Sequence, residues 1–378
     1  MSPVLTLLRE LVALPSVNPA FTSADDPLSG EARVAERLMD LAHCSGLDAE
    51  LQPVLPGRSN LIIRLTPRGR VRQRILLAPH LDTVTLHDLD QLRPVLRNGR
   101  LYGRGSCDTK GSVASMFQAL RTLAARPPRS RPASTEIVFA GLIDEESGQS
   151  GSRALVRSKF KAQLAIVGEP TRLKVITAHK GDIWLALQTK GRAAHGSTPE
   201  LGKNAITQMA KVIEVLEGDY AALLKRKRHP VLGCATLNIG TIQGGRQPNI
   251  VPNLCEMRVD RRTLPGETHS SVVRELRALL RRRGCDITLR DWKGVPSSPL
   301  ETDERLPLVQ SLLALAKQDR PMGVNYFSDA GVLSTGGIPS VVFGPGDIAQ
   351  AHTSDEWVSV KQVESATDLL VRFLGDQA

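Results

Sequence analysis

The chain has 378 residues, of which 41% are apolar and 23% are charged, as in globular proteins with a core large enough for more than one domain. Its net charge is +10, but the basic residues are scattered and aromatic residues make up only 3%, which argues against nucleic-acid binding. No apolar run reaches the ~20 residues of a membrane-spanning helix, so we expect no membrane partner either.

A cytoplasmic location is expected from two features of the sequence. Arg9 and Glu10 interrupt the apolar N-terminal segment, which therefore predicts an amphipathic helix and not a signal peptide. The five cysteines are an odd number without CxxC spacing, a pattern typical of reduced thiols.

Helix-like and strand-like segments alternate over the first 170 residues. Helices are predicted at 30–46 and 111–125, and strands at 59–67, 74–80, 135–143 and 162–170. This alternation predicts an α/β fold, with a large domain in which a mostly parallel sheet lies between helices.

The pattern changes near residue 179. The segments that follow are a strand (182–191), a helix (203–217), two strands (234–245 and 253–263), a helix (268–283) and a strand (285–292). This order is that of a small α+β domain of the split βαβ, ferredoxin-like type. We therefore predict a large domain of residues 1–178 and 292–378, into which a small domain of residues 179–291 is inserted.

Residues that can bind a metal follow the apolar strands of the large domain. They are His80 and Asp82, Asp108, Glu145 and Glu146, Glu169, and His352. Loops after the strands of such a sheet meet at one edge, where His nitrogen and carboxylate oxygen could converge on zinc or a similar ion. Taken singly, each of these residues has a structural alternative to metal binding: a local His–Asp pair, a solvated loop or a Glu-Pro turn. Their joint occurrence favours a metal centre, since two cations would also relieve the repulsion within the run 144–146.

These stretches resemble the M20 family of metallopeptidases and deacylases. The matching segments are HLDTV, GRGSCDTKG, DEESG, VGEPT, GRAAHGSTPELGKNAI, GGRQPNIVPNLCEMRVDRRTLPGE and GPGDIAQAHTSDEWV. They run in the order of the family from residue 80 to residue 358, so the resemblance covers nearly the whole chain.

The resemblance implies two divalent metal ions, zinc or cobalt. His80, Asp108 and Glu169 would bind one ion, and Asp108, Glu146 and His352 would bind the other. Asp108 would then bridge the two ions, because a carboxylate has two oxygens.

The resemblance also implies a hydrolase that cleaves amide bonds, with Glu145 as the general acid/base and Asp82 orienting the first histidine ligand. The inserted domain would be a lid and dimerisation domain, so the protein is expected to be a homodimer. His195 in this domain would reach the other subunit's active site and stabilise the oxyanion. Asn249 and Arg262 would contact the substrate.

The substrate implied is a small N-acyl amino acid. AHKG, VNYFSDAGVL and FGPGDIAQAHTSDE are most similar to the deacetylases that convert N-acetylornithine to ornithine and acetate in arginine biosynthesis. Lys180 would hold the α-carboxylate and Asp329 would face the cationic side chain, the alternatives being a surface lysine and a helix-capping aspartate. Because Asp329 stands where glutamate is usual, N-acetylcitrulline, succinyl-diaminopimelate, other N-acyl amino acids and dipeptides are alternative substrates. A catalytically silent binding protein is the alternative from a different class.

Overall fold

The computed structural model describes residues 1–23, 25–292 and 294–377. The chain forms two compact units. Unit 1 comprises Met1–Thr177, Glu301–Met322 and Ser328–Ala378, and unit 2 comprises Ala178–Leu300 and Gly323–Phe327. The predicted division into a catalytic and a lid domain stays a prediction, because these units are defined by compactness and not by function.

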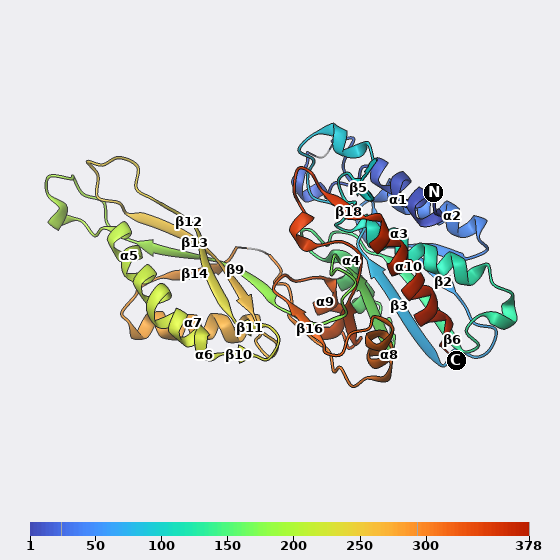
Figure 1. Cartoon of the computed structure of the whole chain (residues 1–378). Coiled ribbons are helices and arrows are strands. Elements are labelled where there is room, and N and C mark those ends of the chain that lie inside the picture. The colour runs from blue at the N-terminus through green and yellow to red at the C-terminus, as the bar shows by residue number, and fades with distance from the viewer. Residues whose placement is uncertain (24, 293, 378) are drawn as a thin grey trace. The chain divides into compact units, whose positions relative to one another are not determined.

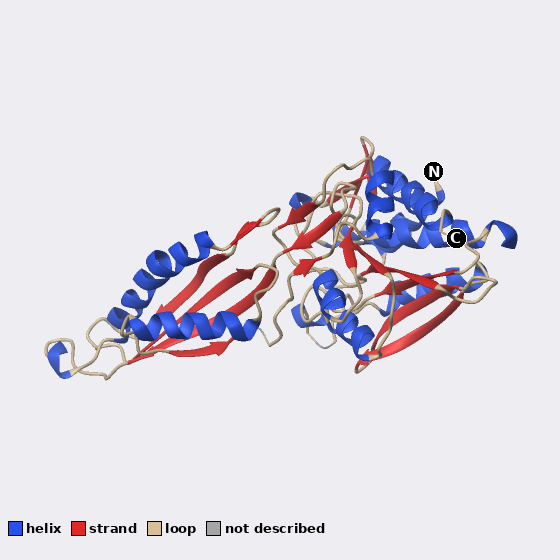
Figure 2. Ribbon diagram, turned by 90° about the horizontal axis from the view of Figure 1, so that it is seen from below, coloured by secondary structure: helices blue, strands red, loops and turns tan. Residues whose placement is uncertain are grey.

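A nine-stranded sheet forms the centre of unit 1 (Figures 1 and 2). Its strands, in spatial order, are β1 (Asp48–Leu55), β2 (Arg58–Leu65), β6 (Thr135–Gly141), β3 (Gln73–Pro79), β7 (Leu164–Gly168), β17 (Ser340–Val342), β8 (Ile176–His179) and β15 (Leu300–Glu301), with β16 (Met322–Val324) paired to β8. The central strands β6, β3, β7 and β17 pair in parallel, whereas β1, β2 and β8 pair antiparallel. β6 and β7 are buried along their whole length, as expected for parallel strands covered on both faces.

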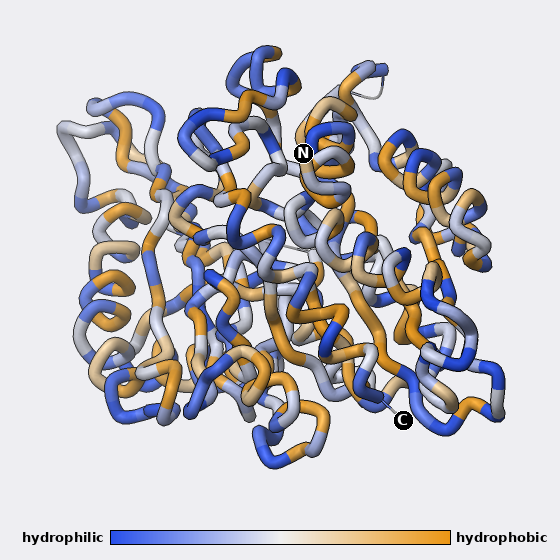
Figure 3. Tube along the Cα trace, turned by 45° about the vertical axis from the view of Figure 1, so that its right-hand side comes forward, coloured by the Kyte–Doolittle hydropathy of each residue, from blue (hydrophilic) through white to orange (hydrophobic). Residues whose placement is uncertain are grey.

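Helices cover the faces of this sheet. They are α1 (Pro3–Ala13), α2 (Ala32–Cys44), α3 (Lys110–Ala124), α4 (Ser150–Arg157), α8 (Pro307–Leu315), α9 (Asp329–Thr335) and α10 (Val360–Gly375). α1, α2, α3, α8 and α10 share one apolar core with alternate side chains of the sheet, such as Ile75, Leu77 and Phe139. Figure 3 shows apolar residues in orange along the central strands. The predicted α/β fold, with a mostly parallel sheet between helices, is confirmed.

A second, three-stranded sheet also belongs to unit 1. It consists of β18 (Trp357–Ser359), β5 (Arg100–Tyr102) and β4 (Val95–Arg97), in that spatial order. β18 pairs antiparallel with β5, so the chain just after residue 352 lies beside the chain just before residue 108. Among the described residues, no helix combines the length and apolar character needed to span a membrane.

Unit 2 is built on a four-stranded antiparallel sheet (Figure 2). Its strands, in spatial order, are β12 (Thr236–Gly244), β13 (Leu254–Thr263), β9 (Gly181–Lys190) and β14 (Thr288–Asp291). Its other elements include η4 (Pro199–Leu201), α5 (Ala205–Val215), the π-helical turn η5 (Leu216–Tyr220), α6 (Ala221–Arg226), α7 (His269–Arg282) and the short strands β10 (Arg228–His229) and β11 (Gly233–Cys234). In β13, Cys255, Met257 and Val259 point into a core shared with α5 and α7. The predicted small α+β fold is therefore also confirmed.

Candidate metal centre

Three parallel strands bring their carboxyl ends to one edge of the large sheet. His80 follows β3 directly and forms a parallel bridge with Leu142, just beyond β6. Glu145 and Glu146 follow β6, and Glu169 follows β7 directly. Because β3 lies between β6 and β7 in parallel register, these side chains start from neighbouring points.

Asp108 lies at the centre of the cluster. Its Oδ1 is 3.2 Å from Nε2 of His80, and its Oδ2 is 3.2 Å from Nε2 of His352. Nε2 of His352 is also 3.3 Å from Oε2 of Glu146, and Nε2 of His80 is 3.9 Å from Oε1 of Glu169. The structure thus brings the five predicted metal-binding side chains together, with one Asp108 oxygen directed to each histidine.

The chemistry of this cluster fits divalent cations. Oε1 of Glu146 and Oε1 of Glu169 are buried and have no hydrogen-bond partner among the described residues. A buried carboxylate oxygen without a donor costs free energy, which bound cations would offset. His80, Asp108 and Glu146 offer one set of ligand atoms within 4.8 Å of one another, and two histidines with several carboxylates suit zinc or a related ion.

The pKa shifts within the cluster are also those expected of a site that binds cations. Burial raises the pKa of Glu145 and Glu169 well above their usual range, and that of Glu146 to about 6. Hydrogen bonds to Asp108 and Glu146 raise the pKa of His352 to about 10. Burial alone would raise the pKa of Asp108, but its hydrogen bonds with the two histidines outweigh this effect and lower it. Metal ions would replace these retained protons and keep the carboxylates ionised.

Asp82 holds the turn that carries the two glutamates. Its carboxylate accepts the backbone N–H groups of Glu145 and Glu146, both at 3.1 Å. Nδ2 of Asn18 donates to the same carboxylate at 2.7 Å. Nδ1 of His80 lies 3.0 Å from the backbone oxygen of Asp82 and 3.5 Å from its Oδ1. Asp82 therefore contacts both His80 and the glutamate turn.

The role of Asn18 could not be predicted from the sequence, because an asparagine before a proline is typical of a simple turn. Its Oδ1 does cap such a turn at Ala20, but its Nδ2 also donates to Asp144 at 3.1 Å. Asp144 further accepts hydrogen bonds from Ser150 at 2.5 Å and from Arg58 at 3.4 Å. These contacts give Asp144, the first of the three consecutive acidic residues, a structural role.

Asp329 is a buried acid of unit 1. It is 1% exposed, and its Oδ1 accepts a hydrogen bond from Ser152 at 2.5 Å. Its Oδ2 is buried without a hydrogen-bond partner in the described part of the chain, and burial raises its pKa to about 7. Ser328 caps α9 by accepting the N–H of Ala330, so the interpretation of Asp329 as the helix cap is wrong.

Two predicted site residues of unit 2 lie beside one another. His195 forms an antiparallel bridge with Ile250, and the N–H of Gly196 donates to the carbonyl of Asn249 at 2.8 Å. The imidazole of His195 is exposed and its Nδ1 is 2.7 Å from Oγ of Ser197. His195 and Asn249 therefore lie on adjacent segments, with both side chains accessible.

The two predicted cations of unit 2 already have partners. Lys180 is only 5% exposed and donates to the carbonyl of Cys234 at 2.7 Å, so the interpretation as a surface lysine is wrong. Arg262 donates to both oxygens of Asp260, from Nε at 2.9 Å and from Nη2 at 2.8 Å. Its guanidinium carbon also lies 5.8 Å from the ring centre of Phe327.

Comparison with known proteins assigns the chain to a family. Residues 76–376 match peptidase family M20/M25/M40. The chain is 31% identical over 363 residues to an acetylornithine deacetylase of Vibrio cholerae serotype O1, covering 91% of each chain. Its fold is similar to the M20 family metallo-carboxypeptidase Sso-CP2 from Sulfolobus solfataricus, with a TM-score of 0.79 and 19% identity over 99% of each chain. It is also similar to the dinuclear metal-binding M20 peptidase YXEP of Bacillus subtilis, with a TM-score of 0.69 and 13% identity over 98% of this chain and 96% of that one. The chain therefore belongs to peptidase family M20/M25/M40 and is a hydrolase that acts on amide bonds.

Proposed function

We propose that this protein hydrolyses the amide bond of an N-acyl amino acid, with N-acetylornithine as the preferred substrate and ornithine and acetate as products. The observation that carries the proposal is the position of the Asp108 carboxylate. One of its oxygens faces His80 and the other faces His352. Glu169 lies near the first histidine and Glu146 near the second. Such an arrangement suits two divalent ions, zinc or cobalt, that share one carboxylate.

Five side chains would hold the two ions. His80, Asp108 and Glu169 would bind one, and Asp108, Glu146 and His352 the other. When bound, such ions polarise a carbonyl and make water nucleophilic near neutral pH. His352 is the most accessible of the five, with a side chain that is 52% exposed, whereas the side chain of Asp108 is 8% exposed. The substrate would therefore approach from the side of His352.

Glu145 would move the proton during the reaction. It is 7% exposed and shares a turn with Glu146, and one of its carboxylate oxygens lies within 4.8 Å of ligand atoms of His80 and Glu169. Burial raises its pKa, which suits a group that takes a proton from the attacking water and passes it to the leaving amine. His195 from a second subunit would donate a hydrogen bond to the oxyanion, a contribution of a few kcal/mol.

The charge of the substrate would be matched by three further residues. Asp329 has a buried oxygen without a partner in the described chain, which suits a cationic amine such as the side chain of ornithine. Arg262 and Lys180 would bind the α-carboxylate, and Asn249, which lies on the segment adjacent to His195, would contact the substrate from the second subunit together with that histidine. The identity of the V. cholerae relative favours N-acetylornithine over N-acetylcitrulline, succinyl-diaminopimelate or a dipeptide.

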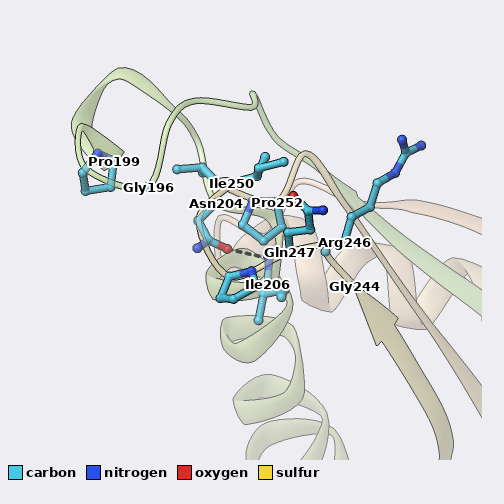
Figure 4. A pocket seen from close by; sticks show the side chains of 12 residues that line it. Gly196, Pro199, Asn204, Ile206, Gly244, Arg246, Gln247, Ile250 and Pro252 are labelled. Atoms are coloured by element: carbon cyan, nitrogen blue, oxygen red, sulfur yellow. Dashed lines mark hydrogen bonds between the residues drawn. The ribbon is translucent and has the colours of Figure 1, made fainter.

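We propose further that the active form is a cytoplasmic homodimer that associates through unit 2. A hollow of about 520 Å³ next to His195 is lined by Ile206, Ile250 and Pro252 (Figure 4). Leu201, Ile206 and Ile250 are 62%, 41% and 40% exposed, and a second copy that covered them would bury apolar surface. The five cysteines are all free, as expected in a reducing compartment.

The test is a panel of N-acyl amino acids, each incubated with the metal-free protein before and after addition of zinc or cobalt. We expect release of free amine from N-acetylornithine only with metal, and loss of that activity with a chelator. Glu145→Gln should lower kcat by about 10²–10⁴-fold, the typical contribution of a general acid/base, while the metal content stays at two ions.

Two results would contradict the proposal in different ways. A protein that binds two ions but cleaves no member of the panel would support a silent binding protein. Glu145→Gln protein that retains full turnover would remove Glu145 from the role of base and leave the metal sites in place.

A further inference from the structure

Glu356 is a buried acid that the proposed function does not use. It lies four residues after His352, immediately before β18, and is 1% exposed. A buried carboxylate is costly unless it is paired and hydrogen-bonded, so its partners indicate why it is there.

The partners of Glu356 all belong to the loop that ends at Asp108. Its Oε1 accepts the backbone N–H of Cys107 at 2.8 Å and that of Asp108 at 3.0 Å. Its Oε2 accepts the backbone N–H of Gly105 at 3.0 Å and Nη1 of Arg104 at 2.7 Å. Both oxygens are therefore occupied by donors of a loop about 250 residues earlier in the chain.

Backbone contacts continue on either side of this carboxylate. The carbonyl of Glu356 accepts the N–H of Gly103 at 3.0 Å, and Trp357 pairs with Tyr102 between β18 and β5. The segment that carries His352 is thereby fastened to the loop that carries Asp108. A shift of either segment would change the 3.2 Å separation of the His352 imidazole and the Asp108 carboxylate.

Arg104, which is itself buried, balances the negative charge of Glu356. Arg104 is 1% exposed and its Nε donates to the carbonyl of Thr85 at 3.1 Å. A simple structural ion pair would need only this arginine. The three backbone donors, one of them the N–H of Asp108 itself, instead give the carboxylate control over the position of a metal-binding residue.

We propose that Glu356 is a positioning residue for the metal centre. By holding three amides of the 104–108 loop, it sets the Asp108 carboxylate between the two histidines and so determines the affinity for both ions. This role rests on the proposed function, because Asp108 must be a shared metal ligand. Groups that orient metal ligands typically change metal affinity or activity by about 10–100-fold when they are altered.

The variant that tests this role is Glu356→Gln in the full-length protein. The amide keeps the size of the side chain, but it replaces one carboxylate oxygen with an NH2 group. That NH2 group cannot accept the hydrogen bonds that the loop donates to the oxygen of Glu356. We expect binding of Zn²⁺ to weaken about 10–100-fold in calorimetric titration, and the absorption spectrum of the Co²⁺-loaded protein to change. With excess metal, kcat should fall while KM stays within about twofold, because Glu356 does not face the substrate.

Glu136→Gln is the matched control. Glu136 is also a buried acid paired with an arginine, Arg74, but it lies at the amino end of β6, whereas the metal cluster follows the carboxyl end. This variant should lower the melting temperature and leave the Zn²⁺ affinity and the Co²⁺ spectrum unchanged. Glu356→Asp is a second variant that keeps the negative charge opposite Arg104 and shortens the reach by one methylene group. It should weaken metal binding in the same way. If Glu356→Gln does not fold, Glu356→Asp still tests the proposal.

The outcomes separate the two proposals. Wild-type Zn²⁺ affinity and an unchanged Co²⁺ spectrum in Glu356→Gln or Glu356→Asp, with only a lower melting temperature, would overturn the positioning role and leave the proposed function intact. Wild-type protein that binds neither Zn²⁺ nor Co²⁺ would overturn the proposed function and the role of Glu356 together.

Discussion

The three acidic residues after β6 have different partners, although they are neighbours in the chain. Asp144 has φ 67° and turns toward Ser150 and Asn18, whereas Glu146 faces His352. Glu145 lies near His80 and Glu169 on the other side of the cluster. Adjacent like charges are tolerated here because hydrogen bonds fix the first, and because cations at the cluster would compensate the other two.

The specificity for a cationic substrate is expected to depend on Asp329. In Asp329→Asn, kcat/KM for N-acetylornithine should fall about 10–100-fold, which corresponds to a charged hydrogen bond of about 1.5–3 kcal/mol. The value for N-acetylnorvaline, which lacks the amine, should change little. Because burial raises the pKa of Asp329 to about 7, the wild-type enzyme should also lose its preference for the cationic substrate as the pH falls below this value.

Steady-state kinetics with both substrates between pH 6 and pH 8 provide the measurement. The variant should show no pH dependence of the ratio of the two kcat/KM values. Equal losses for both substrates would mean that Asp329 supports the fold of the site and does not select the side chain.

At the scale of elements, the segment that runs from the end of β6 into the start of α4 leaves no room for a side chain at Gly151. A Cβ atom on Gly151 would lie 2.5 Å from Oδ1 of Asn60, 2.6 Å from the nitrogen of Ile143 and 2.7 Å from its oxygen. Asn60 itself binds both ends of this turn, since its side chain accepts a hydrogen bond from the N–H of Ile143 and donates one to the carbonyl of Gly151. The turn that carries the glutamates is thus packed against backbone atoms that cannot move independently.

Gly151→Ala is therefore expected to destabilise the protein by about 1–3 kcal/mol and to weaken Zn²⁺ binding, because the turn must shift. Gly218→Ala is the matched control, since Gly218 lies in the helical turn η5 with nothing within 4 Å of the added carbon. It should leave stability unchanged or raise it by about 0.5–1 kcal/mol. Urea unfolding of both variants gives the comparison, and equal stabilities would contradict the steric argument.

The sequence predicted those elements whose burial leaves a clear pattern. β3, β6 and β7 were predicted because strands buried on both faces are continuous apolar runs. β1 (Asp48–Leu55) was missed, because it is an edge strand without a buried residue. The helix predicted at 203–217 ends as an α-helix at Val215 but continues through a π-helical turn into α6, and no periodicity distinguishes such a turn.

The site was predictable for a similar reason, and only in part. Acids and histidines directly after apolar strands can be found along the sequence, since the sheet brings strand ends together. Asn18 and Glu356 could not be found in this way, because they reach Asp82 and Asp108 across 64 and 248 residues. Hydrogen bonds of this range depend on the packed fold and leave no periodic signal in the sequence.

At the scale of the whole molecule, the charge of the surface and that of the site are opposite. The chain carries a net charge of +10, yet the candidate metal centre gathers four buried or nearly buried carboxylates around two histidines. A basic surface can steer anionic N-acyl amino acids toward the protein, and cations at the centre are needed to balance the cluster. The stability of the whole protein should therefore depend on metal and on pH together.

Removal of the metal is expected to destabilise the protein more at pH 8 than at pH 6. In the metal-free protein the pKa of Glu146 is raised from its ordinary 4.5 to about 6, and those of Glu145 and Glu169 are raised further by burial. The folded state thus holds protons that the unfolded state has released, so stability falls as the pH rises from about 4.5 through these raised values. His352 acts in the same direction, because its pKa is raised to about 10. The contribution of its protonated form to the stability of the folded state is complete below pH 6.5, its ordinary pKa, and is lost as the pH rises toward 10.

Asp108, whose pKa is lowered, does not change the stability between pH 6 and pH 8, because its stabilising contribution is already complete above pH 3.8, its ordinary pKa. Bound ions replace the retained protons, and their affinity increases with pH as the ligands lose protons. Zinc at about 100 times its Kd stabilises the folded state by about 2.7 kcal/mol. The melting temperature of the zinc-loaded protein minus that of the chelated protein, measured by calorimetry, should therefore be several degrees larger at pH 8 than at pH 6. A difference that stays constant over this range would show that the cluster does not exchange protons for metal.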